Sequence, residues 1–97
     1  MKTLNEISTI LRQHSNVLAE KYGIAIVGIF GSYVRGEQKP GSDLDLLAEI
    51  LRPISLLKLI GAELYLSDLL GVKVDLVPKR NIRKELREDI LNEAVAP

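Results

Sequence analysis

Apolar side chains recur at helical intervals along the N-terminal stretch of the chain. They belong to Leu4, Ile7, Leu11, Leu18 and Tyr22, and His14 falls on the same stripe. Just ahead of the stripe, Thr3 and Glu6 have the spacing of a capping box, in which the two side chains satisfy free backbone N–H groups. The pattern predicts a helix that begins there and ends at Gly23.

Three later stretches favour β-strands. Ile24–Phe30 is an uninterrupted apolar run rich in β-branched residues, which predicts a strand buried on both faces. A second strand is expected from Asp43 to about Ile50. Alternation of side-chain type over Val72–Val77 predicts a third strand that ends at Pro78.

Helical segments are predicted after each strand. Gly31-Ser32 breaks the first strand, and a short helix is expected from there to Gly36. Pro53 suits the first turn of a longer helix whose apolar face comes from Leu56–Leu70 and which Gly71 stops. Asn81 is expected to cap a last helix, with an inward face made of Ile82, Leu86, Ile90 and Leu91.

The element order is therefore αβαβαβα, without repeats or low-complexity tracts. It predicts an α/β (α+β) fold in which helices flank a small mixed three-stranded sheet. We expect residues 1–97 to form a single domain, because a chain of 97 residues has no room for a second.

Composition and charge exclude several classes of protein. With 46% apolar and 27% charged residues, the chain is neither disordered nor collagen-like. Thirteen basic and thirteen acidic residues cancel, so the overall charge provides no non-specific attraction to nucleic acid or membrane. The absence of cysteine excludes disulfides, thiolate metal sites and cysteine catalysis. The chain start lacks a signal peptide's apolar run, and Ile54–Val72 carries three charges, so a cytoplasmic protein is expected.

The stretch from Gly31 to Asp45 carries the candidate chemistry, and two known motifs fail to explain it. Gly31 and Gly36 have the outer spacing of a P-loop, but Glu37-Gln38 stand where that loop needs Lys and Ser/Thr. A calcium loop starting at Asp43 fails as well, because it would lack its turn glycine and its closing Glu.

Two aspartates on the second predicted strand suggest a metal site. Asp43 and Asp45 are two residues apart, so their side chains project from the same face. Like charges held so close repel, and Mg²⁺, which prefers a few carboxylates plus substrate phosphates, removes that cost. Asp75 joins them if the second and third strands are neighbours. The alternatives are solvated acids on an exposed edge and, for Asp75, an ion pair with Lys73.

The Gly31-Ser32 pair marks a corner between a buried strand and a helix. Glycine lets the backbone approach a ligand, serine offers a hydroxyl, and the helix start presents free N–H groups, so the corner favours a phosphate. A phosphate corner beside metal-binding carboxylates is the arrangement needed to transfer a group from a nucleoside triphosphate.

These residues resemble the DNA polymerase beta-like nucleotidyltransferase superfamily, and its minimal nucleotidyltransferase (MNT) group in particular. The resemblance rests on three stretches, G-S-Y-V-R-G (Gly31–Gly36), S-D-L-D-L (Ser42–Leu46) and K-V-D-L-V (Lys73–Val77). It implies that Gly31 and Ser32 bind the triphosphate and that Asp43, Asp45 and Asp75 ligate two Mg²⁺ ions. It also implies that Asp75 helps to deprotonate a hydroxyl that attacks the α-phosphate of ATP.

The resemblance further implies a partner. Minimal nucleotidyltransferases often act as antitoxins that attach AMP to a tyrosine of a helical HEPN-domain toxin. The short chain has no residues for an acceptor-holding domain, so another protein is expected to present the acceptor or to be it. Self- or hetero-association is also an open alternative. Two other functions stay open: a non-catalytic module that masks its partner stoichiometrically, and a transferase for a small molecule such as an aminoglycoside.

Other singled-out residues have structural interpretations. Arg35 is expected to be a solvated or structural charge rather than a phosphate ligand, and Ser42 a turn residue. His14 is interpreted as a packed structural histidine, and Tyr33 either packs on the short helix or stacks on a base. The segment Lys73–Arg87 has six basic and two acidic residues, for which a solvated face, a contact to triphosphate or RNA, and a partner interface all remain open.

Overall fold

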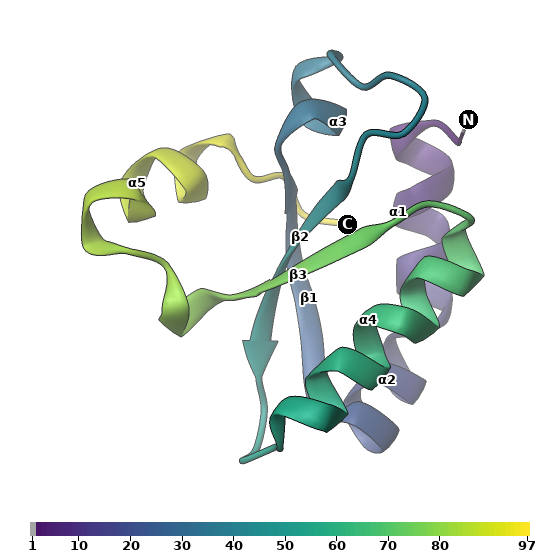
Figure 1. Ribbon diagram of the computed structural model, residues 1–97, viewed down its shortest axis with the longest axis vertical. Helices are drawn as coiled ribbons and strands as arrows, with labels where there is room; N and C mark the ends of the chain where they lie inside the picture. The colour runs from purple at the N-terminus through teal and green to yellow at the C-terminus, as the bar shows by residue number, and fades with distance from the viewer. Residues whose placement is uncertain (1) are drawn as a thin grey trace.

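A three-stranded mixed sheet forms the centre of the computed structural model, which describes residues 2–97 (Figure 1). The strands are β1 (Ile24–Phe30), β2 (Leu44–Ile50) and β3 (Val74–Pro78), in the order β1-β2-β3. β1 and β2 are antiparallel, whereas β2 and β3 are parallel. A parallel pair needs a long crossover, and helix α4 (Leu56–Leu70) provides it. The predicted α/β fold with a mixed sheet is confirmed.

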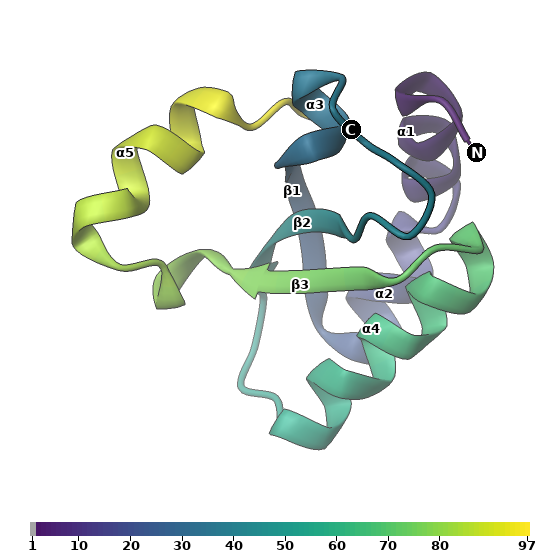
Figure 2. The ribbon, with the colours of Figure 1, turned by 45° about the horizontal axis from the view of Figure 1, so that its top comes forward.

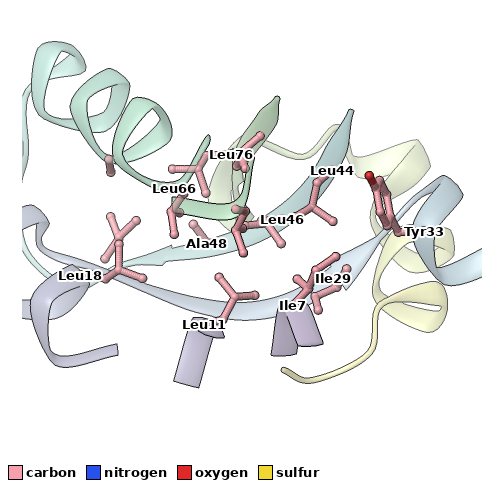
Figure 3. Packing of buried hydrophobic residues seen from close by; sticks show 14 residues of the cluster. Ile7, Leu11, Leu18, Ile29, Tyr33, Leu44, Leu46, Ala48, Leu66 and Leu76 are labelled. Carbon is pink, nitrogen blue, oxygen red and sulfur yellow. The ribbon is translucent and has the colours of Figure 1, made fainter. Parts of the chain in front are cut away.

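The two faces of the sheet are covered differently. Helices α1 (Leu4–Gln13), α2 (Ser15–Tyr22) and α4 lie on one face, and α5 (Lys84–Glu93) lies on the other side (Figure 2). The core fills the space between the sheet and the first three helices (Figure 3). Its fully buried side chains include Ile7, Leu18, Ile24, Ile29, Leu44, Leu46, Leu66 and Val74. The opposite face of the sheet is left more open, and it carries the candidate chemistry.

β1 is less buried than predicted. Ile24, Gly28 and Ile29 are buried, but Ile26 and Phe30 are only half-buried, as are the remaining strand residues. Only one face of β1 meets a full helix layer, because α5 does not lie flat on the other face. The prediction of a strand buried on both faces was therefore wrong.

The N-terminal segment is two helices rather than the single one predicted. His14 lies between α1 and α2, and its backbone (φ −106°, ψ 10°) leaves the helical region. The break lets α2 turn toward β1 and α4, against both of which it packs. Gly23 closes α2 in the left-handed conformation, so the predicted end of the segment is confirmed.

Helix α4 starts later than predicted. Its first residue is Leu56, and Ser55 caps it by accepting a hydrogen bond from the Lys58 N–H (3.1 Å). Pro53 therefore precedes the helix instead of lying in its first turn. The Ser55 hydroxyl accepts a hydrogen bond from a free N–H of the first turn, and proline has no side-chain acceptor that could do so. The helix therefore begins directly after the serine. The predicted end at Gly71 is confirmed.

The last helix also differs from the prediction. Asn81 belongs to a short 3₁₀ turn (η1, Lys79–Asn81) and caps nothing, and α5 begins at Lys84. Of the predicted inward residues, Ile82 is buried, but Leu86 is 50% exposed and Leu91 38%. α5 lies on the side of the sheet away from α1, α2 and α4 (Figure 1), and none of its residues is buried.

The short elements and the strand ends agree with the predictions to within two residues. Helix α3 covers Ser32–Arg35 and ends at Gly36, close to the expected bounds. β2 starts at Leu44 rather than Asp43, and β3 starts at Val74 rather than Val72. Among the described residues, no helix has the length and apolar character that crossing a membrane would require.

The capping box predicted at Thr3 and Glu6 is present. The Thr3 hydroxyl accepts from the Glu6 N–H (3.2 Å), and the Glu6 carboxylate accepts from the Thr3 N–H (3.0 Å). We expect Thr3→Ala to lower the free energy of unfolding by about 1 kcal/mol, because it strips the helix start of one of these bonds. For a domain of this size the midpoint of thermal unfolding falls by roughly 4–8 °C.

The matched control for this prediction is Thr9→Ala within α1. The Thr9 hydroxyl bonds the Asn5 carbonyl inside the helix (3.0 Å), where alanine is an excellent helix former. Urea unfolding followed by circular dichroism measures both variants. Equal midpoints for Thr3→Ala and Thr9→Ala would contradict a stabilising role for the cap.

Candidate active site

The Gly31-Ser32 corner lies where β1 ends and α3 begins. Gly31 has φ 80° and ψ −155°, a backbone conformation that residues other than glycine rarely adopt. Its carbonyl accepts from the N–H groups of Val34 (3.1 Å) and Arg35 (3.2 Å), which starts the short helix. The glycine is thus required by the turn that ends the strand.

The carboxylate of Asp45 lies directly against this corner. Phe30 and Asp45 are register partners in the antiparallel β1–β2 pair. A Cβ added to Gly31 would collide with Oδ2 of Asp45. The missing side chain at Gly31 therefore makes room for the carboxylate, and the predicted phosphate corner lies directly beside Asp45, one of the three predicted metal ligands.

Asp75 is brought beside Asp45 by the parallel β2–β3 pairing, in which the two residues are register partners. Neighbouring strands lie about 4.8 Å apart, and partners in register project from the same face. Leu44 and Val74, which precede them, point into the core and are fully buried. The expectation that the second and third strands are neighbours is confirmed.

Asp43 lies just before β2, at the edge of the group. Its Oδ2 is 3.9 Å from Nζ of Lys73, and both side chains are substantially exposed. An exposed ion pair of this length contributes little to stability. Lys73 therefore lies beside Asp43, and not beside Asp75 as the alternative interpretation had it.

The pKa of the Asp45 carboxyl is raised above its ordinary value of 3.8. Partial burial is the main cause, and the negative charges of Asp75 and Asp43 add to it. Arg35 acts in the opposite direction, and Glu93 raises the pKa a little further. Carboxylates are thus crowded at this point of the sheet without enough positive charge to balance them.

The donor types suit Mg²⁺, although the protein does not enclose a metal site by itself. Residues 2–97 contain no group of three or more His, Cys, Asp or Glu side chains that could hold a metal ion. Mg²⁺ uses one or two carboxylates and completes its shell with waters and substrate phosphates. An open carboxylate pair beside a phosphate corner fits that chemistry. A cation there would also relieve the repulsion from Asp75 and Asp43 that, after burial, contributes to the raised pKa of Asp45.

Glu93, at the end of α5, is part of the site and was missed from the sequence. Its Oε2 accepts from the Gly31 N–H (3.4 Å), and its Oε1 accepts from Nη1 of Arg35 (2.6 Å). The Glu93 carboxylate therefore already accepts a hydrogen bond from the Gly31 N–H, a group that was expected to be free to bind a phosphate. The contact joins residues 62 positions apart, and nothing in the local spacing around Glu93 signals it.

The C-terminal segment is held so that Glu93 reaches the corner. The backbones of Ile29 and Val95 exchange two hydrogen bonds (2.8 and 2.9 Å), which add a short antiparallel bridge to β1. Ala94 lies over Gly28, where a Cβ would come within 3.0 Å of the alanine Cβ. The absence of a side chain at Gly28 thus lets the segment approach the strand.

The structural interpretations of the other residues are confirmed. Arg35 pairs with Glu93, so its charge has a structural partner. The Ser42 hydroxyl accepts from the Lys39 N–H (2.8 Å) within the loop turn. His14 lies at the α1–α2 junction with Nδ1 3.3 Å from the Tyr65 hydroxyl. Tyr33 is buried in the core rather than open for stacking on a base (Figure 3).

Comparison with known sequences gives close relatives across the whole chain. Residues 11–97 match the Nucleotidyltransferase domain family. A Methanocaldococcus jannaschii protein assigned as a protein adenylyltransferase is 54% identical, covering 94% of this chain and 98% of its own length. The protein adenylyltransferase MntA of Thermococcus cleftensis is 46% identical, covering 98% and 96%.

Solved structures share the fold. A structure assigned as a minimal nucleotidyltransferase superposes with a TM-score of 0.81 at 35% identity, covering 99% of this chain and 97% of that one. A toxin–antitoxin complex with AMP-PNP gives 0.69 at 23% identity, covering 95% and 69%. A complex of a tri-AMPylated Shewanella oneidensis HEPN toxin with an MNT antitoxin gives 0.60 at 20% identity, covering 95% and 66%. The last two likenesses concern the fold alone.

Proposed function

The chain belongs to the minimal nucleotidyltransferases of the DNA polymerase beta-like superfamily, and on that premise we propose that it transfers AMP from ATP to a tyrosine of a HEPN toxin and so acts as its antitoxin. Its close relatives are protein adenylyltransferases, which supports a protein as the acceptor. Complexes of the same fold contain a HEPN toxin, which supports the class of partner.

One observation carries the chemistry: the Asp45 carboxylate fits against the bare Cα of Gly31. A phosphate bound at the corner would therefore lie beside the carboxylate, with Asp75 next in register. The Gly31 N–H already binds an anionic group, the Glu93 carboxylate, which supports the corner as an anion site. Triphosphate oxygens would replace that carboxylate and gain the Ser32 hydroxyl as a further donor.

The residues then have distinct roles. Asp43, Asp45 and Asp75 would hold Mg²⁺, which when bound neutralises phosphate oxygens as negative charge builds up on them. Asp75 is the most exposed of the three, and it would accept the proton of the attacking hydroxyl. That oxygen bonds the α-phosphorus, the bond from the α-phosphorus to the bridging oxygen breaks, and pyrophosphate leaves.

The test uses ATP labelled at the α-phosphate, Mg²⁺ and a HEPN-domain toxin. Label is expected on the HEPN protein, at tyrosine, and it should disappear when that tyrosine is changed to phenylalanine. ATP labelled at the γ-phosphate is the control and should transfer nothing. Label from the γ-position alone would indicate a kinase and overturn the proposal.

A second candidate function, masking of the partner by binding alone, is favoured by the exposed apolar side of α4. Leu56, Leu57 and Leu64 are 72%, 80% and 66% exposed there, which is typical of a protein contact surface. Neutralisation of the toxin separates the two functions. Masking predicts that Asp43→Asn neutralises as well as the native chain, whereas adenylyl transfer predicts that it does not.

A further inference from the structure

A cavity of about 410 Å³ lies on the same side of the sheet as the carboxylates, away from the phosphate corner. It is lined by Glu49 and Ile50 of β2, by Lys79 and Arg80 of η1, and by Arg87 of α5. α5 lies apart from the helices of the other face, on this side of the sheet, and contributes Arg87 to the lining (Figure 2). Its three basic residues belong to the segment Lys73–Arg87, for which a solvated face, a contact to triphosphate or RNA, and a partner interface were all open.

The strands fix the distance between this cavity and the reacting groups. Glu49 follows Asp45 by four residues on β2, and Lys79 follows Asp75 by four residues beyond the parallel β3. Because Asp45 and Glu49 are strand residues an even number apart, Glu49 projects from the carboxylate face, and Lys79 lies in the 3₁₀ turn that directly follows β3. Four residues of strand span about 13 Å, which is also the length of about four residues of extended peptide.

The charges around the cavity are unbalanced. Lys79, Arg80 and Arg87 are exposed, and none of the three forms an ion pair with another residue in the range 2–97. Glu49 is the single acidic residue in the lining. Three cations around one concave site favour an anionic ligand, and arginine in particular binds carboxylates through two parallel hydrogen bonds.

The size and lining favour an acidic peptide over a nucleic acid. A cavity of about 410 Å³ accommodates one or two side chains, whereas a nucleic acid strand follows an extended basic groove. The formal net charge of the chain is zero, so the overall charge adds no attraction for a polyanion.

We propose that this cavity binds acidic side chains of the acceptor protein, about four residues from the hydroxyl that receives AMP. The proposal rests on the proposed function, because it assigns the substrate class of the same site. It makes Lys79, Arg80 and Arg87 specificity-determining residues for the acceptor. The phosphate corner lies at the opposite end of β2, so replacing these residues is expected to leave the KM for ATP unchanged.

The experiment compares two tyrosine peptides and two variants. One peptide carries glutamates about four positions from the tyrosine on both sides, and the other carries glutamines there. Arg80→Glu/Arg87→Glu reverses the charge of the cavity. Lys58→Glu, at an exposed lysine on α4 across the sheet, is the control for a charge reversal elsewhere on the surface. Adenylyl transfer and peptide binding, by fluorescence anisotropy, are measured with each protein.

The native chain is expected to bind the glutamate peptide at least about tenfold more tightly than the glutamine peptide, since each charge-assisted hydrogen bond is worth about a factor of ten. Arg80→Glu/Arg87→Glu should remove this preference, with the KM for ATP unchanged. Lys58→Glu should keep it. Equal binding of the two peptides by the native chain, or an equal loss in Lys58→Glu, would overturn the proposal.

Two further outcomes are distinguishable. If the glutamate peptide binds with the expected preference but receives no AMP, the cavity assignment holds and protein adenylylation fails. If Arg80→Glu/Arg87→Glu loses affinity for a labelled single-stranded RNA and not for the glutamate peptide, the cavity is a nucleic-acid site and the proposal is wrong. Circular dichroism confirms that both surface variants remain folded.

Discussion

Asp45→Asn is expected to lower the rate of adenylyl transfer roughly 1,000-fold, a loss of about 4 kcal/mol in transition-state stabilisation. Asparagine keeps the shape of the side chain against Gly31 but removes the charge that would hold Mg²⁺ beside the phosphates. Initial rates with ATP labelled at the α-phosphate measure the effect. Asp68→Asn, an exposed change on α4, is the matched control and should leave the rate unchanged.

The same variant is expected to be more stable than the native chain at neutral pH. The raised pKa of Asp45 means that folding favours the protonated carboxyl. The stabilisation by this group is therefore complete below its ordinary value of 3.8 and is lost as the pH rises through the folded-state pKa. Asparagine stays neutral at every pH, so the stability of the variant does not fall in this way as the pH rises.

Thermal unfolding in a buffer with chelator measures this difference. The midpoint of Asp45→Asn should exceed that of the native chain at pH 7, and the gap should close as the pH falls toward 3.8. A lower midpoint for the variant at pH 7, or transfer at the native rate, would show that Asp45 is a structural residue. Higher stability together with lost activity is the signature of a functional carboxylate.

Gly31→Ala is expected to damage both the fold and the site. The backbone at φ 80° and ψ −155° costs a residue with a Cβ about 1–3 kcal/mol. The added Cβ also collides with Oδ2 of Asp45, so the carboxylate has to move. We expect a fall in the thermal midpoint of about 4–8 °C for each kcal/mol lost, and a decrease in transfer of at least about 100-fold.

Gly36→Ala separates the two effects. Gly36 also has a positive φ, 71°, but a Cβ there meets nothing within 4 Å. It should cost about 1–2 kcal/mol from the backbone and leave transfer near the native rate. If Gly31→Ala and Gly36→Ala reduced transfer equally, the fit between Gly31 and Asp45 would have no catalytic importance.

Local sequence was enough for the elements that depend on neighbouring residues. The capping box at Thr3, the glycine ends of α2 and α4, and the strand alternation around Asp43–Leu46 were all predictable, because each is decided within a few positions of chain. The candidate phosphate corner and the aspartates could be recognised for the same reason. Their roles as ligands remain predictions.

Tertiary structure decided what depends on distant contacts. The break at His14 follows from the need of α2 to pack on β1 and α4, and the helical spacing of the apolar stripe continues through it. The exposed leucines of α5 could not be told from core leucines, because periodicity shows which residues share a face and not what covers that face.

The sequence by itself determined the candidate chemistry: a glycine corner, a hydroxyl and three aspartates on predicted strands. Only the folded chain decided that Asp45 fits against Gly31, that Asp75 lies next to it, and that Glu93 reaches the same corner. The physical reason is that strand pairing and the Ile29–Val95 bridge join segments far apart in the chain. Residue spacing fixes the face on which a side chain lies, and strand pairing fixes its neighbours across the sheet.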